Sequence, residues 1–118
     1  MKEKMLIKLF KKEDAVIRRI SDSYSILNFL TIADSDKVSL GVSEANNHVE
    51  TTKTDSDRAY YVLEGEIIVN NDFHARSGDV IYIPANTEYK FQGTFKSVIV
   101  NSPPFNKNKE VIVSKASA

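Results

Sequence analysis

The feature that most constrains the fold is a pair of neighbouring segments, residues 59–75 and 77–91, each of which is strand-like and broken by a turn. The first, AYYVLEGEIIVNNDFHA, is rich in β-branched and aromatic residues and turns at residues 70–72. Asparagine and aspartate at those positions tolerate the positive φ angles that tight hairpins need. The second, SGDVIYIPANTEYKF, turns again at Pro84. Two consecutive strand–turn–strand units therefore predict an antiparallel sheet, and Gly65 inside the first predicts a bulge or sharp bend.

The rest of the chain continues this pattern of short strands. Further segments rich in strand-forming residues are 24–32, 38–43, 88–92, 95–101 and 110–114, the last being either a strand or part of a frayed tail over 106–118. Residues 44–57 are polar and predict a loop with a short extended piece at 49–54. Residues 13–20 predict one helical turn at most. About eight short strands with little helix predict an all-β sandwich or barrel.

Length and composition restrict the function classes. The 118 residues suit one domain, and the absence of cysteine excludes disulfides, thiolate metal sites and cysteine nucleophiles. Lysine plus arginine and aspartate plus glutamate both number 16, so the net charge is zero. A neutral chain gives no electrostatic basis for binding nucleic acid or an acidic membrane, and we expect neither as a partner.

The amino-terminal segment predicts a cytoplasmic location. Its apolar run, Met5 to Ile7, is only three residues long before Lys8. Such a run is too short for the core of a signal peptide or for a membrane span.

The segment 60–69 is apolar on both faces, which a strand with one solvated face would not be. Tyr60 and Val62 point to one side, and Tyr61 and Leu63 point to the other. The outer side should therefore be covered, either by the N-terminal segment 1–20, as strands or a helical turn, or by a second subunit. We predict a homodimer.

YYVLEGEIIV followed by SGDVIYIPANTEYKF resembles the two signature motifs of the cupin superfamily. The resemblance covers about residues 58–92. It implies a double-stranded β-helix, or jelly-roll barrel, with little helix, formed by a single domain over residues 1–118. It implies function only weakly, because one fold hosts many activities.

The resemblance also locates the positions that bind metal in metal-bearing cupins, where the first motif supplies two histidines and a glutamate and the second supplies a histidine. Aligning on Gly65 puts Arg58 at the glutamate, and counting from Pro84 puts Tyr89 at the last histidine. The first two histidine positions fall on Thr52 and Thr54, or on Thr51 and Lys53 with the longer spacing. None of these is a usual ligand, so we expect no metal and no other cofactor.

An unorthodox metal site is the alternative. His48 and Glu50 share one face of an extended segment, and His74 is the other histidine of the chain. If a slipped alignment brought His48, Glu50 and His74 together, they could bind a metal. Otherwise His48 is a solvated loop residue and His74 a partly exposed strand residue.

Strand alternation and the cupin resemblance predict which side chains line the barrel. The predicted ligand-binding residues are Arg58, Tyr60, Tyr89 and Phe91. Because an unpaired buried charge is costly, Arg58 needs an internal acid or an anionic ligand, unless its head reaches out at the barrel mouth. The sequence-adjacent acids, Asp57, Asp79 and Glu88, should point outward.

These features predict a metal-independent cupin that binds a small anionic or polyhydroxylated molecule in its barrel. The first alternative is a metal-independent isomerase, epimerase or lyase that uses Tyr60, Tyr89 and His48, as metal-free cupins that act on sugars imply. The others are a ligand-free homodimerisation module and a metal-dependent cupin with unorthodox ligands. The sequence leaves open whether the protein is an enzyme.

Overall fold

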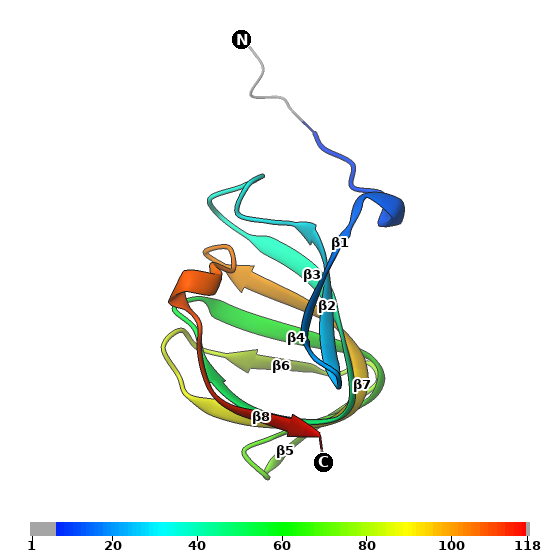
Figure 1. Cartoon of the computed structure of the whole chain (residues 1–118), viewed down its shortest axis with the longest axis vertical. Helices are drawn as coiled ribbons and strands as arrows, with labels where there is room; N and C mark the ends of the chain where they lie inside the picture. Colours follow the sequence, from blue (N-terminus) through cyan, green and yellow to red (C-terminus); the bar gives the residue numbers. More distant parts are fainter. Residues whose placement is uncertain (1–6, 118) are drawn as a thin grey trace.

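The computed structural model describes residues 7–117, in which eight strands form one antiparallel sheet that curls into a barrel (Figure 1). The strands are β1 (Val16–Ser21), β2 (Tyr24–Leu30), β3 (Ser39–Lys53), β4 (Asp57–Val69), β5 (Phe73–Arg76), β6 (Val80–Ile83), β7 (Tyr89–Ser102) and β8 (Val111–Ser117). Within the described residues, the helical segments are two short 3-10 helices, η2 (Lys12–Asp14) and η3 (Lys107–Lys109). The predicted all-β class is confirmed.

Three long strands, β3, β4 and β7, take part in both layers of the barrel. One layer runs β1-β2-β3-β7-β4-β6, because β2 pairs with the first half of β3 and β6 pairs with residues 58–61 of β4. The other runs β8-β3-β7-β4-β5, because β8 pairs with residues 48–53 of β3 and β5 pairs with residues 66–69 of β4. The long strands thus carry side chains into a space enclosed by both layers.

The long strands change direction at matching positions. The register of β3 shifts between Ala45 and His48, and that of β4 shifts between Val62 and Glu64. Gly65 has φ +79°, and a Cβ atom there would overlap the carbonyl oxygen of the paired strand β7. The predicted bend at Gly65 is therefore confirmed, and only glycine fits it.

The turns also follow the sequence. Asn70 and Asn71 have φ angles of 51° and 62° between β4 and β5. Asp79 accepts a hydrogen bond from the backbone N–H of Arg76 at 2.9 Å and so closes the turn before β6. Short polar side chains and positive φ angles stand where the sequence predicts hairpins.

An aromatic cluster fills one part of the interior, with Phe91 at its centre. The Phe91 ring is 1 % exposed, and its centroid lies 5.3–6.2 Å from five other rings. Those rings belong to Tyr24, His48, Tyr60, Tyr89 and Phe95. Burying one such ring contributes about 2–3 kcal/mol to stability.

Several predicted elements need correction. The polar segment 44–57 is largely not a loop, because β3 continues to Lys53 through His48. Segment 13–20 has no more than the one helical turn predicted, in η2, and its remainder is mostly β1. The segments 88–92 and 95–101 are joined in one strand, β7, which begins at Tyr89. Of the two alternatives for 110–114, the strand is confirmed, because β8 begins at Val111. Polarity misled the prediction for β3, since its inward side chains are themselves polar.

The outer face of β4 and β6 is exposed and apolar. Tyr61 and Leu63 are 46 % and 39 % exposed, and Val80 and Tyr82 of the adjoining strand β6 are more so. β1 and β2 lie at the opposite edge of that layer, so the described N-terminal residues do not cover this face, and residues 1–6 lie outside the described residues. A covering second subunit stays a prediction. No helix among residues 7–117 has the length and apolar character needed to cross a membrane.

Candidate functional site

Adjacent stretches of β3, β4 and β7 line the barrel with buried side chains, many of them polar. The inward residues are at most 4 % exposed. They are His48, Glu50 and Thr52 of β3, Arg58, Tyr60 and Val62 of β4, and Tyr89 and Phe91 of β7. The structure thus brings the four sequence-predicted ligand-binding residues into one interior, while their role in binding stays a prediction.

Arg58 is held by neutral partners. Its Nε donates to Asn101 Oδ1 at 2.7 Å, and its Nη1 donates to the Tyr89 hydroxyl oxygen at 2.9 Å. That hydroxyl lies 2.6 Å from the hydroxyl of Tyr60, so the two phenols share a hydrogen bond. Among residues 7–117, no carboxylate forms an ion pair with Arg58. The buried cation is therefore bonded to one phenol and one amide, and the second phenol bonds to the first.

The acids beside the inward positions point away, as alternation predicts. Asp57 accepts from the backbone N–H of Ala85, Asp79 accepts within its own turn, and Glu88 is exposed. None of them neutralises Arg58.

Electrostatics keeps the Tyr60 phenol neutral and the Arg58 guanidinium charged. Burial raises the pKa of Tyr60 well above its ordinary value, and the neighbouring Tyr89 raises it further. Burial disfavours the Arg58 cation, but the phenol oxygens of Tyr89 and Tyr60 more than offset this and raise the pKa of Arg58. The cluster can donate hydrogen bonds to an anionic or hydroxylated group but cannot serve as a base near neutral pH.

His48 and Glu50 form a second cluster. The imidazole Nε2 lies 2.8 Å from Glu50 Oε1 and its Nδ1 lies 2.7 Å from the hydroxyl of Ser23. The ring stacks on Tyr24 with centroids 4.8 Å apart and planes 11° apart. The prediction that His48 is a solvated loop residue is wrong, because β3 carries it into the barrel with no exposed surface.

Burial favours the neutral form of both partners. It lowers the pKa of His48, an effect to which Lys115 adds. It raises the pKa of Glu50 to about 7, and the nearby Glu110 adds to that rise. Between the lowered pKa of His48 and about pH 7, the pair is thus a neutral imidazole hydrogen-bonded to a carboxylic acid, which can pass a proton in either direction.

The alternative metal set of His48, Glu50 and His74 does not assemble. His74 is exposed on β5, where its Nδ1 lies 3.3 Å from Glu66 Oε2. In the described part of the chain, no group of three or more His, Cys, Asp or Glu side chains is arranged to hold a metal ion.

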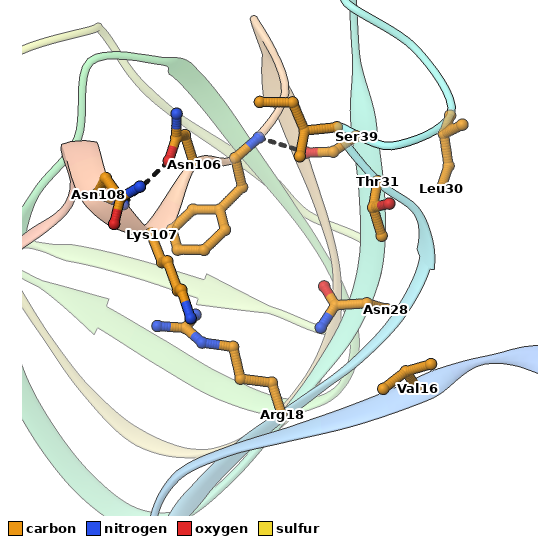
Figure 2. A pocket seen from close by; sticks show the side chains of 11 residues that line it. Val16, Arg18, Asn28, Leu30, Thr31, Ser39, Asn106, Lys107 and Asn108 are labelled. Carbon is orange, nitrogen blue, oxygen red and sulfur yellow. Dashed lines mark hydrogen bonds between the residues drawn. The ribbon is translucent and has the colours of Figure 1, made fainter.

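A cavity of about 410 Å³ opens at the mouth of the barrel (Figure 2). Phe105 forms part of its wall, with the ring centroid 4.7 Å from Arg18 Cζ and 5.9 Å from Arg58 Cζ. A space of only about 10 Å³, lined by Arg58, Asn101 and Phe105 among others, lies further in. Phe105 therefore separates the mouth cavity from the interior cation.

Three residues that complete the site, Asn101, Phe105 and Arg18, were not predicted from the sequence. Asn101 could have been found by continuing the alternation from Tyr89 along one unbroken β7, since both have odd numbers. Phe105 and Arg18 carry no local signal, because they meet only when the chain after β7 crosses the mouth beside β1.

A family model described as ethanolamine utilisation protein EutQ matches residues 4–102, most of the chain. The chain belongs to the EutQ family. No curated protein sequence matches it significantly.

Solved structures share the fold of this EutQ-family chain. Streptomyces Pac13, described as a nucleoside dehydratase, is 18 % identical over 95 % of each chain with a TM-score of 0.78, and variants of it have been solved with uridine. Clostridium difficile EutQ is 21 % identical over 69 % of this chain and 63 % of its own (TM-score 0.61). Ectoine synthase from P. lautus is 16 % identical over 97 % and 94 % (TM-score 0.67). At these identities the likeness shows the fold alone, and the predicted cupin barrel is confirmed.

Proposed function

We propose that this chain binds a small polyhydroxylated or anionic molecule in its barrel without a metal centre. The observation that carries the proposal is Arg58, a buried cation with no carboxylate partner among residues 7–117, which stands behind the open mouth cavity. A guanidinium and two phenols suit hydroxyl, carboxylate or phosphate oxygens. The ligand would reach Arg58 by displacing Phe105.

The test is a binding screen with matched tyrosine variants. Sugar acids, nucleosides and polyols are screened by thermal shift and then titrated by calorimetry. Tyr89→Phe should weaken binding of a hit by about three- to tenfold, the range of one lost hydrogen bond, whereas Tyr82→Phe on the outer face should not. Equal affinity in Tyr89→Phe and wild type would contradict the proposal. One tightly held iron, zinc, manganese or nickel ion per chain would contradict its metal-free part.

A second candidate is a metal-independent lyase that removes water from a polyhydroxylated substrate, and the buried His48–Glu50 pair favours it. Neutral His48 would take a proton from carbon, and the electron pair of that C–H bond would form a C=C bond as the C–O bond breaks. Tyr60 or Tyr89 would give a proton to the departing hydroxyl, which leaves as water, and the proton on His48 would then return to the phenol. Pac13 is described as a nucleoside dehydratase, and its solved variants replace a histidine or a tyrosine, the residue types gathered here.

The lyase test follows the ultraviolet absorbance of the unsaturated product from a panel of hydroxylated aldehydes and nucleosides. His48→Gln should abolish turnover, and His74→Gln, which alters the exposed histidine, should leave it unchanged. Turnover by His48→Gln at the wild-type rate would exclude this role.

We also propose that a second copy of the chain covers the outer face of Tyr61, Leu63, Val80 and Tyr82. The exposure of four large apolar side chains on paired strands supports this. Light scattering should give the mass of a dimer for wild type and of a monomer for Val80→Lys. A wild-type monomer at high concentration would refute it.

A dimer without any ligand is the remaining alternative, which the small space beside Arg58 favours. The cytoplasmic location stays a prediction that cell fractionation can test.

A further inference from the structure

The mouth cavity joins an apolar wall to cationic groups. Val16, Leu30, Ile32 and Phe105 supply apolar surface, and Asn28, Asn106 and Asn108 supply amides. The charged residues that line it are Arg18 and Lys107, and no carboxylate of the described chain is among the lining residues. A space of about 410 Å³ with this lining has the size and composition of a small-ligand site.

Arg18 is oriented in advance. Its Nη2 lies 3.2 Å from Glu110 Oε1, and its guanidinium lies over the Phe105 ring. Glu110 is itself fixed by accepting a hydrogen bond from Thr52 Oγ1. A guanidinium carries five N–H donors, and the bond to Glu110 is the one that the structure gives Arg18 within residues 7–117. The remaining donors are available to a ligand at no further cost in side-chain ordering.

Lys107 brings a second positive charge to the same space. It lies in η3, and Figure 2 shows its side chain and that of Arg18 directed toward each other. Glu110 offsets one of these two charges, so the mouth retains an excess of positive charge. Two cations that face one cavity repel each other unless an anion lies between them.

We propose that the mouth cavity is an anion-binding subsite, and that the ligand carries a phosphate or carboxylate group held by Arg18 and Lys107. The rest of the ligand packs on the wall formed by Val16, Leu30 and Ile32, the aliphatic residues that line the same cavity as Arg18. This inference rests on the proposed ligand-binding function. It names the ligand class and adds residues at the mouth to those of the interior.

The test uses three probes of similar shape: phenyl phosphate, benzoate and uncharged benzyl alcohol. Binding is followed by shifts of the backbone amide signals of Asn28 and Asn106 in NMR titrations at low salt. Arg18→Gln and Lys107→Gln should each lower the affinity for the anion that binds by about tenfold, the effect of one charge-assisted hydrogen bond. The matched control is Arg19→Gln, since Arg19 is the next residue of β1, is exposed and does not line the cavity.

If Arg18→Gln fails to fold, Lys107→Gln still tests anion binding at the mouth, because it leaves the ion pair of Arg18 and Glu110 intact. Binding of phenyl phosphate alone identifies a phosphate ligand, and binding of benzoate identifies a carboxylate. Equal binding of benzyl alcohol, equal weakening by Arg19→Gln, or no shift at the mouth would overturn the inference. Tyr89→Phe separates the two proposals. It should weaken the binding of a ligand in the interior and leave the binding of the anion at the mouth unchanged, whereas Arg18→Gln and Lys107→Gln should weaken the anion at the mouth.

Discussion

Glu50→Gln should change how the stability of the protein depends on pH. Glu50 is 2 % exposed, and burial followed by the nearby Glu110 raises its pKa from the ordinary 4.5 to about 7. Between these values the folded chain keeps the proton that the unfolded chain has already lost. The stabilising contribution of the neutral acid is therefore fully present below about pH 4.5 and is lost as the pH rises through about 7.

The magnitude follows from the two pKa values. The interval from 4.5 to about 7, at about 1.4 kcal/mol for each pH unit, gives a loss of about 3 kcal/mol in unfolding free energy. Glutamine keeps the shape and both hydrogen-bonding functions of the neutral acid but does not titrate. The lowered pKa of His48 works in the opposite direction, because a base that resists protonation destabilises the fold as the pH falls. Since both proteins retain His48, the difference between them isolates Glu50.

Urea unfolding from about pH 4.5 to about pH 8 measures the effect. The unfolding free energy of wild type minus that of Glu50→Gln should fall by about 3 kcal/mol across this range. Glu88→Gln, which removes an exposed carboxylate, should run parallel to wild type. Parallel curves for wild type and Glu50→Gln would mean that Glu50 is ionised in the folded barrel, and the neutral pair with His48 would have to be abandoned.

Three further substitutions and one control variant probe the bend, the aromatic cluster and the mouth. Gly65→Ala should lower the unfolding free energy, measured by urea unfolding, by about 2–3 kcal/mol, because the backbone is strained and the new Cβ overlaps a backbone carbonyl. Gly78 also has a positive φ but has open space around it, so Gly78→Ala should lower the unfolding free energy by only about 1 kcal/mol. Phe91→Ala should cost about 3–5 kcal/mol in the same assay. Phe105→Ala should open the interior and speed hydrogen exchange at Arg58 Nε, measured by NMR; unchanged exchange would mean that Phe105 is not the barrier.

The sequence predicts the fold well where turn chemistry is explicit. Asn70 and Asn71 adopt the positive φ angles that their residue types favour, and Gly65 stands at a bend that no other residue fits. Alternation puts Arg58 and Tyr60 on one face of their strand, the cupin resemblance makes that face the interior, and both side chains are buried. These features depend on local geometry, which is written in a few adjacent residues.

The sequence predicts the site poorly where its polar residues are buried together. His48 and Glu50 lie in a stretch without an apolar face, so the period that marks a strand is absent. Their burial is possible only because Ser23 and Tyr24, more than twenty residues earlier, supply a hydrogen bond and a stacking surface. Such compensation between distant segments cannot be inferred from one local pattern.

Tyrosine at the position of a metal-binding histidine is explained by its neighbour. The cupin resemblance puts Arg58 where metal-bearing relatives have a glutamate, so the cation of this barrel is covalently part of the chain. An imidazole beside it would risk a second positive charge, whereas the phenol of Tyr89 has no cationic form and accepts the Arg58 N–H. At the position of Arg58 the side chain is thereby positively charged, where metal-bearing relatives have a negatively charged one. In a metal-bearing barrel the metal ion selects the ligand. In this barrel the donors are the guanidinium and the phenols, and they match a ligand rich in oxygen acceptors. Oxygen acceptors of a ligand should therefore compete with Asn101 and Tyr89 for the N–H groups of Arg58, even when no metal is supplied.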